Sequence, residues 1–75
     1  MPEDETDLNQ RLRAGNAIAA TLVGLTADEA SDRVEDEGFV PQVIPPGYLV
    51  TADLAPHRIR LVVDESGVVT RAWGG

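Results

Sequence analysis

The sequence predicts an α+β domain, with one helix packed on a small sheet of three strands and a long loop between the first two strands. Three observations carry this prediction. A helix-capping sequence begins at Thr26, apolar residues alternate from Arg58 to Asp64, and a turn sequence follows at Asp64–Gly67. The 75 residues make one small domain. A chain of this size buries only about 60% of its unfolded surface, so we expect no second core.

The N-terminal segment gives the weakest signals. Residues 1–7 carry four acids and almost nothing apolar, which predicts a disordered tail. Leu8 and Leu12 have helical spacing, but Gly15-Asn16 interrupts the pattern. We therefore expect a short or partial helix before residue 21.

The next helix is better marked at both ends. Thr26 can cap its first turn, and Glu29 three residues later completes a capping box. Ala30 and Val34 mark a narrow buried face together with Ala27. Gly38 supplies a left-handed stop at the C-terminal end. Because the buried side chains are small, the helix should lie close to its support.

Three strands follow. Residues 39–44 predict a short strand, with Pro41 limiting its hydrogen bonds on one side. Residues 58–64 predict the central strand, and its apolar side chains fall on one face: Ile59, Leu61 and Val63. After the turn, residues 68–73 predict the return strand of a hairpin.

The long loop before residue 58 is the candidate functional feature. Loops of this length in a compact domain are uncommon and usually functional. Prolines restrict the backbone near both of its ends, and Gly47 is a turn residue.

Two arginines of the following strand face the same way, because strand side chains alternate. The guanidinium groups of Arg58 and Arg60 suit carboxylate or carbonyl oxygens, and the nearest loop partners are Thr51 and Asp53. If the loop arches over the strand, these four residues meet and Ala52 is left at the outer bend. The alternative is that the two arginines merely solubilise the outer face of the strand.

Composition excludes several classes of function. The net charge is −7, which disfavours a nucleic-acid partner. No apolar run approaches the roughly 18 residues that cross a bilayer. Absence of cysteine excludes disulfides, a thiol nucleophile and zinc–thiolate sites. The acidic N-terminus is unlike a secretion signal, so we expect a cytoplasmic protein, or a secreted or periplasmic one if a signal has been removed.

No catalytic or metal site is expected. His57 is the only histidine, and it has no neighbouring ligands at metal-binding spacing. Thr51, Asp53 and His57 invite comparison with a catalytic triad, but all three lie in one short loop without a glycine-rich oxyanion motif. We therefore predict no enzymatic activity and no cofactor.

The ordered motifs resemble those of the potato type I serine-protease inhibitor family, and still more closely its short microbial relatives, which include a fungal elastase inhibitor. The resemblance covers residues 22–75 and leaves residues 1–21 as a separate acidic, partly disordered or weakly helical segment. The matching segments are Leu22-Val23-Gly24, Thr26–Ala30, Pro46-Gly47, Val50–Asp53, Arg58–Leu61, Val63-Asp64 and Gly67–Arg71.

The resemblance implies a fold, a mode of action and a site. The strands that flank the loop would run parallel, and the last strand would pair antiparallel with the central one. The loop would present the Ala52–Asp53 peptide bond to a serine protease as a substrate that is hardly consumed. The protease-binding residues would be Leu49, Val50, Thr51, Ala52, Asp53 and Leu54, and the supporting residues would be Gly47, Arg58 and Arg60.

Two departures from the family pattern shape the expected target. Many members have a large apolar residue where this chain has Ala52, so a subtilisin-like or small-pocket elastase-like protease fits better than a chymotrypsin-like one. Asp53 replaces the glutamate of many plant members. The inhibitor is expected to be monomeric. The alternative function is a non-inhibitory protein–protein interaction module on the same fold.

Overall fold

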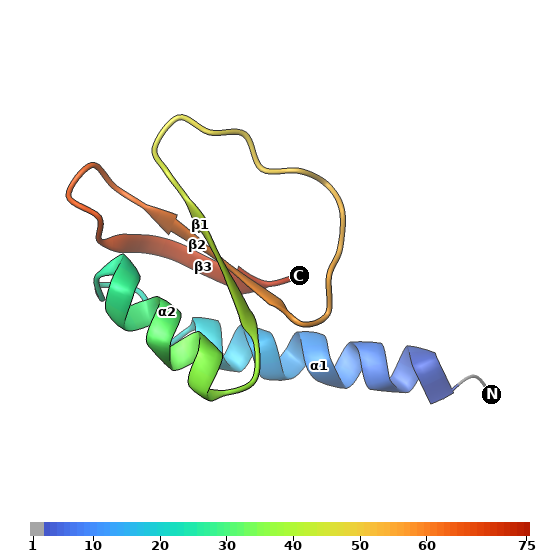
Figure 1. The fold of residues 1–75 in the computed structure, drawn as a ribbon. Coiled ribbons are helices and arrows are strands. Elements are labelled where there is room, and N and C mark those ends of the chain that lie inside the picture. Colours follow the sequence, from blue (N-terminus) through green and yellow to red (C-terminus); the bar gives the residue numbers. More distant parts are fainter. Residues whose placement is uncertain (1–2) are drawn as a thin grey trace.

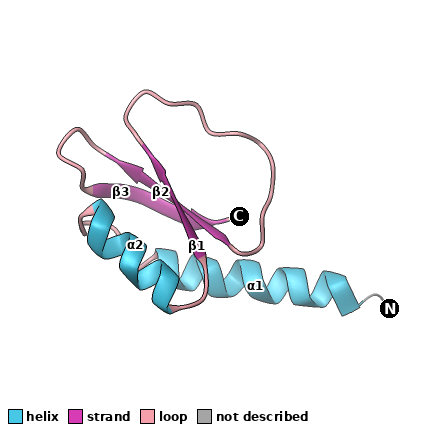
Figure 2. Ribbon diagram, viewed as in Figure 1, coloured by secondary structure: helices cyan, strands magenta, loops and turns pink. Residues whose placement is uncertain are grey.

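The computed structural model describes residues 3–75, and Met1 and Pro2 lie outside the described part. The predicted α+β class is confirmed, with two helices rather than one (Figures 1 and 2). Along the chain the elements are α1 (Glu3–Ala19), α2 (Ala27–Asp36), β1 (Val40–Ile44), β2 (Arg58–Val63) and β3 (Val69–Gly74). No helix within residues 3–75 is long and apolar enough to cross a membrane.

The three strands form one sheet in the order β1-β2-β3. β1 runs parallel to β2 with Val40 opposite Arg58, and β2 runs antiparallel to β3. Neighbouring parallel strands need a connection of a dozen residues or more, which in most proteins contains a helix. Here residues 45–57 make that connection without one, and they form the wide loop of Figure 1. The length of the loop is therefore tied to the topology of the sheet.

α2 forms as its capping sequence predicts. The Glu29 amide donates to the Thr26 hydroxyl oxygen at 3.2 Å, and Gly38 has a φ of 81° just beyond the helix. A positive φ suits glycine because it has no Cβ. Ala30 and Val34 are fully buried. The N-cap hydrogen bond fixes where α2 begins, and the two small side chains allow it to lie close to the sheet.

The side chains on the two faces of β2 contact different parts of the molecule. Ile59, Leu61 and Val63 are buried in the core with residues of both helices. The other face carries Arg58 and Arg60 toward the loop. The hairpin to β3 closes as predicted, with the Gly67 amide donating to the Asp64 carbonyl at 3.0 Å. β2 thus packs into the core with one face and contacts the loop of residues 45–57 with the other.

The predicted interruption of the first helix is wrong, because α1 runs through Gly15 and Asn16. A Cβ placed on Gly15 would lie 3.3 Å from the Cα of Gly74, and the Asn16 side-chain oxygen accepts from the Gly74 amide at 2.9 Å. Glycine costs a helix about 1 kcal/mol relative to alanine. At this position the missing side chain lets α1 approach β3 closely.

The N-terminal end of α1 also differs from the prediction. The sequence predicts a disordered tail for residues 1–7, whereas in the structure residues 3–7 begin α1. The remaining two residues of that predicted tail lie outside the described residues. The helix extends beyond the sheet on the side where the loop joins β2 (Figure 1).

Candidate functional site: the loop between β1 and β2

The loop leaves β1 through a tight turn. The Tyr48 amide donates to the Pro45 carbonyl at 3.3 Å, and Gly47 between them has a φ of 81°. A residue with a side chain rarely adopts that angle. At the other end of the loop, the Arg58 amide donates to the Ala55 carbonyl at 3.1 Å, immediately before β2.

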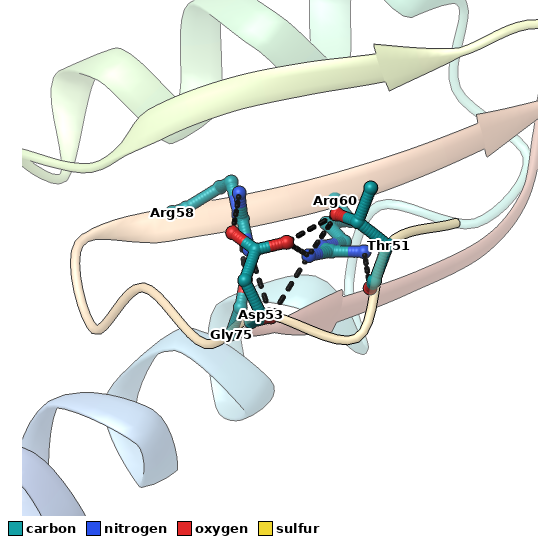
Figure 3. A network of polar contacts seen from close by, with 5 residues as sticks. All are labelled: Thr51, Asp53, Arg58, Arg60 and Gly75. Carbon is teal, nitrogen blue, oxygen red and sulfur yellow. Dashed lines mark hydrogen bonds and ion pairs between the residues drawn. The ribbon is translucent and has the colours of Figure 1, made fainter. Parts of the chain in front are cut away.

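The Arg60 side chain lies between β2 and the middle of the loop (Figure 3). Its side chain is only 3% exposed. One terminal nitrogen donates to the Thr51 carbonyl at 2.7 Å, and the other donates to the Asp53 carbonyl at 3.0 Å. The second nitrogen also lies 3.1 Å from the Asp53 carboxylate. One guanidinium therefore holds backbone on both sides of Ala52.

Arg58 supports the same residue from a second direction. Its terminal nitrogens lie 3.1 Å from the Asp53 carbonyl and 3.1 Å from the Asp53 carboxylate. Its Nε donates to the backbone oxygen of Gly75 at 2.7 Å. Arg58 thereby links the loop to Gly75, the residue after β3, as the labelled residues in Figure 3 show.

The Asp53 carboxylate lies at the centre of these contacts. The Thr51 hydroxyl donates to it, and both guanidinium groups contact it. The hydrogen bonds from Thr51 and then Arg58 lower the pKa of Asp53 from 3.8 to about 2. Because a bonded carboxylate is favoured over its protonated form, Asp53 is charged throughout the neutral and mildly acidic range.

The side chains along the loop point mostly to solvent. Leu49 is 96% exposed and Tyr48 is 71% exposed, whereas Val50 and Leu54 are 43% and 59% exposed. Ala52 is also exposed and lies at a bend. The structure thus brings Thr51, Asp53, Arg58 and Arg60 together, whereas Leu49, Val50, Ala52 and Leu54 stay exposed to differing degrees.

The loop has neighbours that sequence reasoning missed. Gly75 meets Arg58, and the Arg11 side chain of α1 reaches His57 at 2.8 Å. The pair Gly74-Gly75 was the one available signal, since glycine in or after a strand often marks close approach of two backbones. Neither periodicity nor spacing relates Arg11 to His57.

Among the side chains that the structure describes, from Asp7 to Gly75, no three histidine, cysteine or acidic side chains gather as a metal site. Within the same range, His57 makes no hydrogen bond to Thr51 or Asp53, and its ring contacts Arg11 instead. The hydrogen bonds from Arg58 and Arg60 hold the peptide backbone of the loop.

A small scaffold that holds an extended loop from beneath defines a class of protein that presents a peptide segment to another protein. The chain belongs to the Potato inhibitor I family, whose sequence profile matches residues 21–72. That match includes α2, all of β1 and β2, the loop and most of β3.

Known relatives agree with this assignment. The chain is 54% identical over 55 residues to subtilisin inhibitor CLSI-I of Canavalia lineata, covering 71% of this chain and 83% of that protein. It is 48% identical over 52 residues to subtilisin inhibitor 1 of Phaseolus angularis, covering 67% of this chain and 56% of that protein. The chain is thus an inhibitor of the potato inhibitor I type rather than an enzyme.

Two solved structures share the fold. Bitter gourd trypsin inhibitor superimposes with a TM-score of 0.67 at 33% identity, covering 73% of this chain and 85% of its own. The elastase inhibitor AFUEI superimposes with a TM-score of 0.57 at 15% identity, covering 93% of this chain and 97% of its own. At that low identity the second likeness bears on the fold alone.

Proposed function

We propose that the protein inhibits subtilisin-like or elastase-like serine endopeptidases by presenting the Ala52–Asp53 peptide bond as a substrate. The observation that carries this proposal is the bracing of Thr51 and Asp53 by Arg58 and Arg60. These contacts fix the backbone before and after Ala52 while its side chain stays exposed. Relatives of the chain are subtilisin inhibitors, which supports the choice of protease class.

The mechanism follows from where the loop is held. A protease serine would attack the carbonyl carbon of Ala52, form an ester and release the amino group of Asp53. In an ordinary substrate the released segment diffuses away. Here Asp53 stays bonded through its carbonyl and its carboxylate to two arginines. The amine therefore remains beside the ester, and religation competes with hydrolysis.

Rigidity also strengthens binding of the intact loop. A flexible peptide loses conformational entropy when a protease orders it, by about 0.5–1.5 kcal/mol for each immobilised side chain and more for the backbone. A loop already held by its scaffold loses less. The same braces thus favour tight binding and slow cleavage.

The identity of Ala52 determines the expected target range. A methyl group fills a shallow specificity pocket but leaves a deep one largely empty. An elastase-like enzyme therefore fits this residue directly. A subtilisin-like enzyme fits if it gains additional contact from the exposed side chains of Leu49 and Val50.

Titration of subtilisin, an elastase and chymotrypsin with the purified protein tests the proposal. We expect stoichiometric loss of subtilisin or elastase activity, weak inhibition of chymotrypsin, and slow cleavage confined to Ala52–Asp53 by mass spectrometry. Rapid digestion at several bonds without inhibition would instead indicate the non-inhibitory interaction module.

A further inference from the structure

α1 is the one helix of the described structure that lies outside the residues matched by the family profile. The profile begins at residue 21, after the end of α1, and stops at residue 72, before Gly74 and Gly75. These two unmatched segments meet beside the loop. The contacts between them, and from them to the loop, suggest a role for α1 that the family assignment does not provide.

The first contact joins α1 to the last residue of the loop. An Arg11 terminal nitrogen lies 2.8 Å from Nδ1 of His57 and 3.2 Å from its Nε2. One turn earlier in α1, the Asp7 carboxylate accepts from the Arg11 Nε at 3.0 Å. Asp7 therefore directs the guanidinium toward the loop. The His57 backbone is held as well, since its carbonyl accepts from the Val40 amide at 2.7 Å.

The second contact is apolar and passes through Gly75. A Cβ built on Gly75 would lie 3.0 Å from a methyl carbon of Leu54 and 3.8 Å from a methyl carbon of Leu12. A leucine of the loop and a leucine of α1 therefore both approach Gly75 on the side where a side chain would stand. Gly75 also pairs with Arg58 in both directions, through its amide at 2.9 Å and its oxygen at 2.7 Å.

A third contact joins Gly74, the neighbour of Gly75, to α1. The Asn16 side-chain oxygen accepts from the Gly74 amide, and Gly15 allows the two backbones to approach. α1 thus holds Gly74 and Gly75, Gly75 holds Arg58, and Arg58 holds Asp53. All of these contacts reach the loop after Ala52.

We propose that α1 is a second support of the loop, specific for the segment from Asp53 to His57. Arg11 and Leu12 are positioning residues in this proposal. It rests on the proposed inhibitory function, because the supported segment is the one whose amine is released when the Ala52–Asp53 bond is cleaved. By retaining that segment, α1 favours religation over hydrolysis of the ester.

The first test needs no protease. Amide hydrogen exchange is measured in Arg11→Ala, Leu12→Ala and Arg13→Ala at three amides: those of Val40 and Arg58, which donate to the His57 and Ala55 carbonyls, and that of Tyr48 in the turn after β1. Arg13 is the matched control, because it is exposed on the same helix and has no hydrogen bond or ion pair with the side chains described from Asp7 onward. We expect about tenfold faster exchange of the Val40 and Arg58 amides in the first two variants, through loss of a charge-assisted hydrogen bond in Arg11→Ala and of apolar contact in Leu12→Ala. The Tyr48 amide in these variants, and all three amides in the control, should not change. Equal exchange in all three variants would overturn the proposal.

The second test measures how much of the protein is cleaved at Ala52–Asp53 when it is held with a protease until equilibrium. The ratio of cleaved to intact protein at equilibrium should rise about tenfold in Arg11→Ala and Leu12→Ala, and Leu12→Met should restore it. If α1 only stabilises the fold, the variants should have lower melting temperatures, but at temperatures well below melting their ratio of cleaved to intact protein should equal that of the parent. That result would refute the proposal. If the parent protein inhibits no protease, the proposed function fails, whereas the exchange measurement still decides whether α1 supports the loop.

Discussion

The two arms of the loop are held very differently. In residues 45–50, before Thr51, the side chains of Tyr48 and Leu49 are largely exposed, and the one hydrogen bond within this arm is that of the Pro45–Tyr48 turn. In residues 53–57, after Ala52, Asp53 is bonded to two arginines, Leu54 lies against Gly75, and His57 is contacted from α1.

This asymmetry separates two requirements of a substrate-like inhibitor. The leading arm, residues 45–50, keeps its apolar side chains available to a partner, so it can supply affinity. The trailing arm, residues 53–57, is retained on the scaffold, so it can limit hydrolysis of the ester that forms when a protease attacks Ala52. Changes in the two arms should therefore affect different measurements.

The largest effect is expected for Arg60→Ala. This change removes the hydrogen bonds to the Thr51 and Asp53 carbonyls from a side chain that is 3% exposed. At about 1.5 kcal/mol for each charge-assisted hydrogen bond, inhibition should weaken roughly 100-fold. The inhibition constant and the rate of cleavage at Ala52–Asp53 are the measurements.

Arg71→Ala is the matched control for that variant. Arg71 lies over the Trp73 ring at 5.1 Å and makes no hydrogen bond to the loop among the described residues. It should inhibit as the parent does. If Arg60→Ala also inhibits like the parent, the bracing of the loop does not account for the proposed inhibition.

A second large effect is expected for Ala52→Leu, which changes the exposed residue between the two arms. The added carbons would be buried in a deep specificity pocket at about 0.8 kcal/mol for each methylene, or about 2 kcal/mol in all. Inhibition of chymotrypsin should improve roughly 30-fold, whereas that of an elastase with a small pocket should weaken. An unchanged ranking of the three proteases would place the contact residue elsewhere in the loop.

Leu49→Ala examines the leading arm. Because the parent side chain is 96% exposed, the free energy of unfolding should change by no more than about 0.5 kcal/mol. Inhibition of subtilisin should nevertheless weaken about tenfold through lost apolar contact. Chemical denaturation and an inhibition assay on the same sample make the comparison. A loss of stability with unchanged inhibition would contradict the division of roles between the arms.

The smallest effect is expected from acid. The pKa of Asp53 is lowered from 3.8 to about 2, so its charged form is the one that the folded loop favours. Its contribution to loop order is present above pH 4 and is lost as the pH falls through about 2. Backbone relaxation of residues 51–54 between pH 5 and pH 2 follows this change without a protease. Asp53→Asn should show little pH dependence over that range, and loss of order already above pH 4 would indicate another group.

Local sequence signals determined much of the fold. Thr26 and Glu29 lie three residues apart, so the hydrogen bond that begins α2 is readable along the chain. Alternation places Ile59 and Leu61 in the core, which leaves Arg58 and Arg60 on the other face. The meeting of those arginines with Thr51 and Asp53 was also predictable, because both partners lie within nine residues.

Only the tertiary structure decided how α1 and the end of β3 serve the loop. Asn16 and Gly74 are 58 positions apart, and Arg11 and His57 are 46 positions apart. No local preference encodes such contacts, since helix propensity at Gly15 even argued against the helix that makes them. They arise because packing α1 against β3 brings distant backbones together, and that packing outweighs the local preference of the residues involved.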